Sequence, residues 1–267
     1  MGESFVLETR RLVKSFKGFI AVDDVNLKIK KGHIHALIGP NGAGKTTVFN
    51  LLTKFLAPTT GQILFNGEDI TALKPAAIAR KGVIRSFQIS AVFPHMTALE
   101  NIRVALQRSE GTTFSFWKSG TTLNRLNDRC MELLDSVDLA EYANTMTIEL
   151  AYGRKRALEL ATTLAMEPEL LLLDEPTQGM GAEDVDGVVQ LIRKAAAGRT
   201  ILMVEHNLGV VSKLCNRITV LAQGTVLTEG DYTTVSVDPR VREVYMGRAA
   251  SGERDARAPA DQTSIVQ

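Results

Sequence analysis

The sequence has few cysteines and almost no net charge. Its 267 residues include only two cysteines, Cys130 and Cys215, and their spacing matches no metal-binding motif. We therefore expect two reduced, buried thiols. The net charge of +1 argues against a dedicated nucleic-acid-binding protein, which usually carries a basic face. A hydrophobic fraction of 45% is ordinary for a globular chain and suffices for a sizeable core.

Long apolar runs are also missing. The longest ones, such as residues 170–173, have the length of a strand and fall far short of the roughly 20 apolar residues that cross a bilayer as a helix. The first residues lack the basic start and the apolar stretch of a secretory signal. We expect a cytoplasmic protein that reaches a membrane only through a partner.

The spacing of apolar residues predicts an α/β fold. Alternation over the first thirty residues is typical of antiparallel strands, and a short apolar strand at 33–38 then leads into glycines. Later in the chain, strands alternate with helices, which favours a mainly parallel sheet with covering helices. The other predicted elements are a helix at 46–55, a strand at 62–65, strands at 170–174 and 200–204, helices at 182–196 and 208–214, and a hairpin over 217–229.

The middle of the chain is predicted to be helical. Residues 99–106 and 123–137 have helical spacing, and no strand candidate lies between about residues 90 and 149. We interpret about 90–165 as a helical subdomain inserted into one domain that spans residues 5–248. Residues 249–267 are small, polar and charged, which predicts a disordered tail.

A glycine-rich motif joins the strand at 33–38 to the following helix. Gly39-Pro40-Asn41-Gly42-Ala43-Gly44-Lys45-Thr46, with Thr47 next, matches the phosphate-binding pattern G-x-x-x-x-G-K-[ST]. Glycines let backbone N–H groups converge on phosphate oxygens at the positive end of a helix. In this pattern Lys45 reaches the outer phosphates and the Thr46 hydroxyl binds Mg²⁺. The alternative is a glycine-rich turn that binds nothing.

Two carboxylates and a histidine follow buried strands. Asp174 and Glu175 end the strand at 170–174, where ligands bind in open α/β sheets. We expect Asp174 to hold Mg²⁺ and Glu175 to act as the general base on the attacking water. His206 follows the strand at 200–204, and as a neutral imidazole it could contact the terminal phosphate and fix Glu175. The alternatives are a solvated acidic pair and a structural histidine; His33, His35 and His95 are interpreted as structural.

These motifs together resemble the ABC ATPase family, over about residues 7–247. The resemblance implies a P-loop NTPase core with an N-terminal antiparallel β-subdomain and an inserted α-helical subdomain, and it implies ATP and Mg²⁺ as cofactors. Ser86-Phe87-Gln88 matches the glutamine loop of the family, so Gln88 would contact Mg²⁺ and the water and couple the site to a membrane subunit. Phe16 matches the aromatic residue that stacks on adenine; the alternative is a Phe16 packed in the core.

The family signature, commonly Leu-Ser-Gly-Gly-Gln, corresponds here to Leu150-Ala151-Tyr152-Gly153-Arg154, before a helix predicted at 155–166. In the family this helix start faces the ATP of a second subunit, so Ala151, Tyr152 and Gly153 would bind nucleotide across a pair of identical or paralogous chains. Ala151 removes a hydroxyl donor and Arg154 adds a positive charge, which we expect to compensate in part. Gly181 stands where many relatives carry Asp, in a segment that links the two ATP sites.

Within the family the chain looks most like the ATPases of branched-chain amino-acid importers. The pointers are the Leu-Ala-Tyr-Gly signature, Ala21-Val22-Asp23-Asp24-Val25, a long insert around 114–128 and the ending Val244-Tyr245-Met246-Gly247. This resemblance implies two membrane permease subunits, an external substrate-binding protein, no nucleic acid, and a location on the inner face of the cell membrane.

Four alternatives remain open at this point. Related ATPases serve urea or amide import or lipopolysaccharide export, so the cargo could differ. A soluble ABC ATPase of DNA repair or translation is a second alternative, and a scaffold that no longer hydrolyses ATP is a third. Finally, Phe114, Phe116 and Trp117 in the insert either pack locally or touch the membrane subunits.

Overall fold

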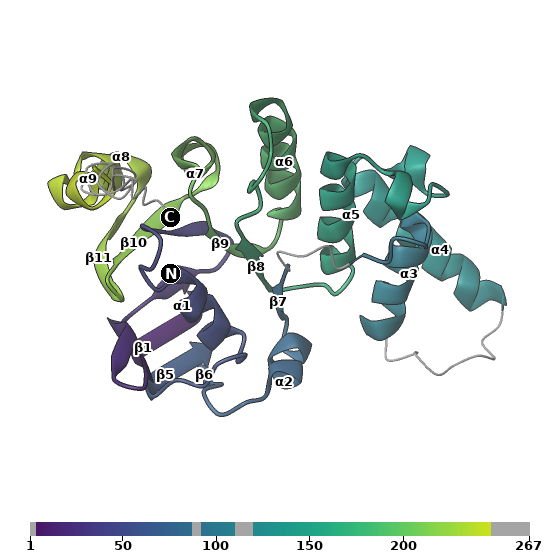
Figure 1. The fold of residues 1–267 in the computed structure, drawn as a ribbon. Helices are drawn as coiled ribbons and strands as arrows, with labels where there is room; N and C mark the ends of the chain where they lie inside the picture. The colour runs from purple at the N-terminus through teal and green to yellow at the C-terminus, as the bar shows by residue number, and fades with distance from the viewer. Residues whose placement is uncertain (1–3, 87–91, 110–119, 247–267) are drawn as a thin grey trace, which may run out of the picture.

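The protein is described by a computed structural model that covers residues 4–86, 92–109 and 120–246 (Figure 1). Five of the residues and segments singled out above, namely Gln88, Phe114, Phe116, Trp117 and the predicted tail at 249–267, lie outside the described residues. Among the described residues no helix is long and apolar enough to span a membrane.

An antiparallel sheet forms the N-terminal part, as the alternating pattern predicts. Its strand order is β2-β1-β5-β6, and β3 pairs with another part of β1. Shifts in register along β1 allow neighbouring residues Val6 and Leu7 both to be buried, as β-bulges do. The strands are β1 (Phe5–Phe16), β2 (Phe19–Val25), β3 (Lys28–Lys30), β5 (Thr60–Phe65) and β6 (Glu68–Asp69).

A second, mainly parallel sheet carries the phosphate-binding motif. Its order is β11-β10-β4-β9-β8-β7, in which only the edge pair β10–β11 is antiparallel. The predicted α/β class with a mainly parallel sheet is therefore confirmed. The strands are β4 (Ile34–Ile38), β7 (Val83–Arg85), β8 (Leu170–Asp174), β9 (Thr200–Val204), β10 (Arg217–Ala222) and β11 (Thr225–Gly230).

The central strands of this sheet are buried on both faces. In β8, Leu171 and Leu173 belong to one core cluster, whereas Leu170 and Leu172 belong to the other. Successive side chains of a strand point to opposite faces, so a strand between two cores needs an unbroken apolar run. The run of four leucines meets this requirement. On one side of the strand lie the N-terminal sheet and helix α1 (Lys45–Leu52), and on the other side lie helices α5 (Tyr152–Leu164) and α6 (Ala182–Ala195).

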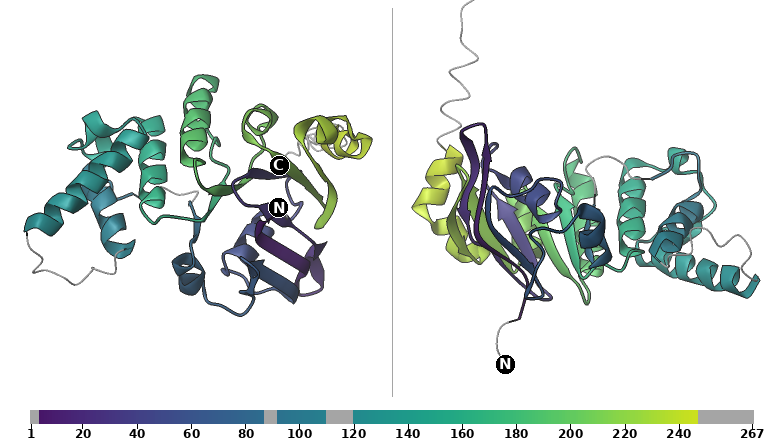
Figure 2. Two further views of the ribbon diagram at one scale, coloured as in Figure 1. Left: turned by 180° about the vertical axis from the view of Figure 1, so that it is seen from behind. Right: turned by 90° about the horizontal axis from the view of Figure 1, so that it is seen from below.

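The helices lie around the two sheets and in a group beyond β7. Figures 1 and 2 show α3, α4 and α5 together, on the far side of β7 from the antiparallel sheet. From residue 92 to 149 the described residues form no strand, only one isolated bridge between Thr97 and Met146. The helices are α1 (Lys45–Leu52), α2 (Pro75–Arg80), α3 (Ala98–Ser109), α4 (Gly120–Ser136), α5 (Tyr152–Leu164), α6 (Ala182–Ala195), α7 (Leu208–Leu214), α8 (Tyr232–Val237) and α9 (Pro239–Met246), with 3-10 turns at Ala140–Tyr142 and Thr147–Glu149.

Some predicted boundaries were wrong, and several short elements were not predicted, among them β6 and the two 3-10 turns. The first helix ends at Leu52 rather than at residue 55, because Lys54 adopts a left-handed backbone with φ 63°. Helix α5 begins at Tyr152 rather than at residue 155, so Tyr152 and Gly153 belong to its first turn. Strand β7 has three residues, which is too short to show periodicity, and α2, α8 and α9 were also missed. The limits of the helical subdomain, about 90–165, stay a prediction.

Both cysteines are free, as predicted, although Cys215 is only half-buried whereas Cys130 is buried. Burial raises the pKa of the Cys130 thiol to about 11. Burial, with a smaller contribution from Glu205, raises the pKa of the Cys215 thiol to about 12. Since the thiolate is the reactive form, both should react with a maleimide at least about 100-fold more slowly at pH 8 in the native chain than in denaturant, and Cys215 more slowly than Cys130. Mass spectrometry at timed intervals measures this, and rapid labelling of the native chain would contradict it.

Candidate functional site

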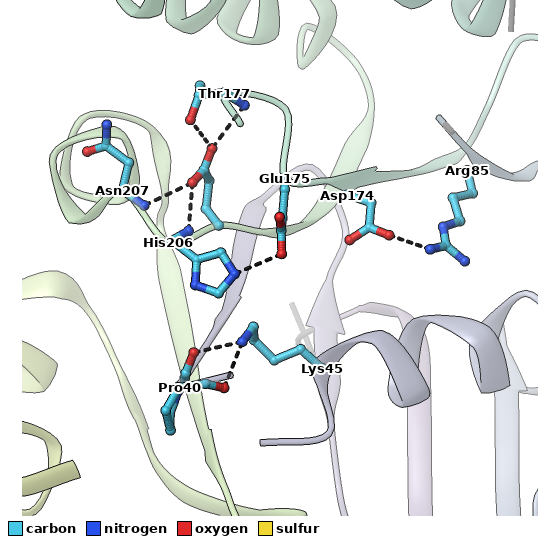
Figure 3. A network of polar contacts seen from close by, with 10 residues as sticks. Pro40, Lys45, Arg85, Asp174, Glu175, Thr177, His206 and Asn207 are labelled. Carbon is cyan, nitrogen blue, oxygen red and sulfur yellow. Dashed lines mark hydrogen bonds and ion pairs between the residues drawn. The ribbon is translucent and has the colours of Figure 1, made fainter. Parts of the chain in front are cut away.

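Three neighbouring strands deliver the candidate residues to one edge of the parallel sheet. Leu37 of β4 pairs with Val204 of β9, and Val204 pairs with Asp174 of β8. The carboxyl ends of the three strands therefore lie side by side. Figure 3 shows the residues that follow these strands grouped around one place, as the sequence predicts for this edge.

The phosphate-binding motif forms a tight loop between β4 and α1. Gly39 has φ 147°, and a Cβ there would lie 2.1 Å from the carbonyl oxygen of Leu221. The Lys45 ammonium is buried and donates to the carbonyl oxygens of Gly39 at 2.7 Å and Pro40 at 3.0 Å (Figure 3). Gly44 caps α1 with no side-chain hydrogen bond. A buried cation thus lies beside the positive end of a helix, an arrangement that suits a phosphate group.

The side chains expected to hold a metal ion offer oxygen atoms. Thr46 is exposed at the start of α1, and Asp174 is buried at the end of β8, with 6% of its surface exposed. The described residues contain no group of three or more His, Cys, Asp or Glu side chains that could hold a metal by themselves. A hydroxyl and a carboxylate fit Mg²⁺, which prefers oxygen ligands and commonly shares them with the phosphates of its substrate.

Glu175 and His206 are brought together, as the sequence predicts. His206 Nε2 lies 2.8 Å from Glu175 Oε1, and both side chains are partly accessible (Figure 3). Glu175 has a left-handed backbone with φ 49°, and its N–H donates to the Val204 carbonyl at 2.9 Å. This conformation is costly for a residue with a side chain, and such strain occurs preferentially at functional sites. Here it turns Glu175 from the direction of β8 toward His206.

Glu205 was not predicted as a site residue, yet it joins two loops of the site. Its side chain is buried, with 3% exposed. One carboxylate oxygen accepts hydrogen bonds from the backbone N–H and the hydroxyl of Thr177. The other accepts from the N–H groups of His206 at 2.6 Å and Asn207 at 2.9 Å (Figure 3). Glu205 therefore fixes the segment after Glu175 against the segment that carries His206. Its signal in the sequence is a charged residue directly after a buried strand.

Phe16 is accessible at the surface, whereas His35 is buried in the parallel sheet. Phe16 is 40% exposed, and the Lys14 ammonium lies 5.0 Å from its ring centre, so the alternative of a core residue is wrong. Its stacking on adenine stays a prediction. His35 is buried in β4 and pairs with the Thr219 hydroxyl at 2.8 Å. Burial lowers the pKa of His35 to about 4, so the ring is neutral at pH 7 and has a structural position away from the site.

The signature segment is connected to the loop after Glu175. Ala151 is the N-cap of α5 and makes no side-chain capping bond. The Tyr152 hydroxyl donates to the carbonyl oxygen of Gln178 at 3.4 Å and accepts from the Arg156 guanidinium at 3.1 and 3.3 Å. Gly181, at the end of the same loop, is the N-cap of α6. One hydroxyl thus joins the start of α5 to a loop that follows β8.

Arg154 makes a contact that the sequence did not predict. Its guanidinium lies 4.0 Å from the centre of the Tyr142 ring, a cation–π arrangement. Its partial compensation for Ala151 at a bound anion stays a prediction.

The fold and the arrangement of this site define an ATP-binding cassette. The chain belongs to the ABC transporter family, whose model matches residues 22–178. It is 40% identical over 251 residues to the high-affinity branched-chain amino acid transport ATP-binding protein BraF of Pseudomonas aeruginosa, covering 91% of this chain and 98% of BraF.

Solved structures of cassettes are also similar. The ADP conformation of MJ1267, an ATP-binding cassette of an ABC transporter, superposes with a TM-score of 0.79 at 28% identity, covering 92% of this chain and 100% of that one. A dimeric post-hydrolysis cassette, MJ0796 bound to ADP and Pi, gives a TM-score of 0.70 at 26% identity, covering 85% of this chain and 98% of that one.

Replacing Gly39 with Ala should displace the phosphate-binding loop. The new Cβ would meet the Leu221 carbonyl at 2.1 Å, so the loop must move away from β10. We expect at least a tenfold loss of ATP affinity, about 1.4 kcal/mol, measured by titration calorimetry. Gly32→Ala is the matched control, because Gly32 also has a positive φ but has open space around it. Equal ATP affinity in both variants would show that the close approach does not shape the loop.

Replacing Glu205 with Gln should loosen the two loops that it joins. An amide NH₂ group would face N–H donors that now meet a carboxylate oxygen. We expect a loss of about 2 kcal/mol in the free energy of unfolding and a fall in kcat larger than any change in KM for ATP. Chemical denaturation and steady-state kinetics measure the two effects. Asp186→Asn, at an exposed ion pair with Lys213, is the control. A Glu205→Gln variant with wild-type kcat would contradict the argument.

Proposed function

We propose that this chain is the ATP-binding and ATP-hydrolysing subunit of an ABC importer for branched-chain or related hydrophobic amino acids. The observation that carries the proposal is the Glu175–His206 contact of 2.8 Å at the edge of the sheet that also carries the phosphate-binding loop. A candidate base, its orienting partner and a phosphate cradle are thereby gathered within one site.

The phosphate-binding loop would hold ATP. Backbone N–H groups at the start of α1 and the Lys45 ammonium would supply positive charge for the phosphates, and Phe16 offers an exposed ring for the adenine. Thr46, Asp174 and Gln88 would hold Mg²⁺. When bound, this ion neutralises negative charge that develops on the phosphate oxygens.

Glu175 would accept a proton from the attacking water, and His206 would keep the carboxylate in position. A general base must lie within hydrogen-bond reach of the water that it activates, and its orientation limits the rate. The side chains of His206 and Glu175 are 39% and 15% exposed, respectively, so a water molecule can reach both. The intact base and its partner argue against a scaffold that has lost hydrolysis, despite Ala151 and Gly181.

A second cassette would complete each ATP site. The N-terminus of α5, with Ala151, Tyr152 and Gly153, presents backbone N–H groups that no side chain caps. Such a helix start can receive the terminal phosphate held by the phosphate-binding loop of the partner chain, identical or paralogous. The dimeric form of the similar cassette MJ0796 supports this arrangement.

The cargo and the membrane partners are inferred from the likeness to BraF. The name of that relative supports branched-chain amino-acid transport as the process. Uptake as its direction, two permease subunits in the membrane and an external binding protein are part of the proposal. The chain would then work on the cytoplasmic side of the membrane, attached through the permeases.

The test uses the chain with its permeases and binding protein in vesicles. We expect leucine together with the binding protein to stimulate ATP turnover and to be taken up. Glu175→Gln should keep ATP affinity and lower turnover by roughly 10² to 10⁴-fold, because only the base is lost. Asp186→Asn, far from the phosphate loop in sequence and exposed, should leave both unchanged. Undiminished hydrolysis in Glu175→Gln would refute the assigned base, whereas stimulation by urea or an amide instead of leucine would refute the cargo.

A further inference from the structure

Arg85 makes a buried ion pair inside the site, although it belongs to none of the motifs described above. It is the last residue of β7, and its guanidinium Nη2 donates to the Asp174 carboxylate (Figure 3). The side chains are 13% and 3% exposed, respectively. Figure 3 shows Arg85 approaching Asp174 from the side opposite to Glu175 and His206. The residue expected to bind the metal ion is therefore already in contact with a cation.

Two residues of α1 hold the guanidinium in this position. Its Nη1 donates to Asn50 Oδ1 at 2.7 Å, and the guanidinium carbon lies 5.8 Å from the centre of the Phe49 ring. Asn50 and Phe49 belong to the helix that begins at the phosphate-binding loop. Arg85 thus connects the end of β7 with the metal-binding carboxylate on β8 and with the helix behind the phosphates.

The pair is incompletely satisfied. Arg85 Nε is buried and meets no acceptor within the part of the chain that the structure describes. Removing two charges from water is costly, and a buried pair repays that cost only when its remaining donors and acceptors are satisfied. Stability of the fold alone is therefore a poor reason for Arg85 at this place. A buried carboxylate such as that of Asp174, however, is costly without a positive charge or hydrogen-bond donors beside it, and Arg85 supplies both.

We propose that Arg85 is a positioning residue that supplies the positive charge beside Asp174 until the metal ion of the bound nucleotide supplies it instead. The inference rests on the proposed function, because it assumes that metal and nucleotide bind here. Two cations then compete for one carboxylate, so the metal affinity of the site is set partly by how firmly Asn50 and Phe49 hold the guanidinium. Binding of metal would weaken the link between β7 and β8, and β7 leads directly to Ser86 and Gln88.

Replacing Arg85 with Gln separates this role from a merely structural one. Without metal the variant leaves Asp174 buried without its ion pair to Arg85, so its Tm in EDTA should fall by about 5 °C or more. With saturating Mg²⁺ and ADP the deficit should shrink to less than half, because the ion replaces the missing charge. The Mg²⁺ concentration at half-maximal stabilisation, at fixed ADP, should fall at least about threefold because the competing cation is gone. ADP is used so that hydrolysis does not contribute.

Two further variants control the experiment. Arg85→Lys keeps the charge but loses the planar group that reaches both Asp174 and Asn50, so its Tm in EDTA and its Mg²⁺ midpoint should lie between those of the wild type and Arg85→Gln. Arg129→Gln removes a guanidinium from accessible ion pairs with Glu132 and Glu167, and its Tm shift should be the same with and without metal.

The outcomes separate the inference from the function on which it rests. A wild-type chain that gains no stability from Mg²⁺ with ADP would overturn the proposed function. A wild-type chain that does gain stability, together with an Arg85→Gln deficit that is equal in EDTA and in Mg²⁺ with ADP, would overturn the role of Arg85 alone. If Arg85→Gln folds only with metal and ADP present, the inference is supported, and the Mg²⁺ midpoint of Arg85→Lys completes the test.

Discussion

The parallel pairing of β9 between β4 and β8 is the interaction on which the site depends. It aligns the ends of three strands, so the phosphate-binding loop, the acidic pair and His206 emerge next to one another although they are distant in sequence. A slip of one residue in either ladder would turn every side chain to the opposite face. Such a slip is opposed by burial, because the residues of β8 and β9 alternate between two apolar cores. The apolar cores thereby fix the register of the strands, and the register fixes the relative positions of the candidate site residues.

The elements that could be predicted from the sequence are those with a strong local pattern. The strands β8 and β9 were predicted with their observed limits, because an unbroken apolar run between polar residues leaves little choice. The phosphate-binding loop was likewise visible, since its glycines and lysine are consecutive. Arg85 and Glu205 were not recognised, because their importance comes from partners that are 89 and 28 positions away. No periodicity or motif encodes a contact of that kind, and it appears only once the strands are paired.

Two buried carboxylates of the site, Asp174 and Glu205, are stabilised by different kinds of partner. Glu205 is surrounded by N–H and hydroxyl donors of its own loops, and these donors are part of the fold. Asp174 is paired with a cation, carried by a long side chain that reaches it from another strand. Neutral donors fixed in the backbone suit a carboxylate with a permanent structural task, whereas a side-chain cation can be exchanged for another cation. The contrast explains how acidic groups so close in the fold can serve different purposes.

The hydrogen bond from Tyr152 to Gln178 has a consequence for cooperativity. In the proposed head-to-tail pair, α5 of each chain would face the nucleotide of its partner, while the loop with Gln178 follows Glu175, the proposed base for the chain's own nucleotide. The Tyr152 hydroxyl would then connect, within one chain, the helix start at the partner's nucleotide with the loop beside the chain's own nucleotide. A cassette with the common signature has glycine in place of Tyr152 and cannot form this bond. Cassettes that differ at this position should therefore differ in how strongly occupancy of one site is felt at the other.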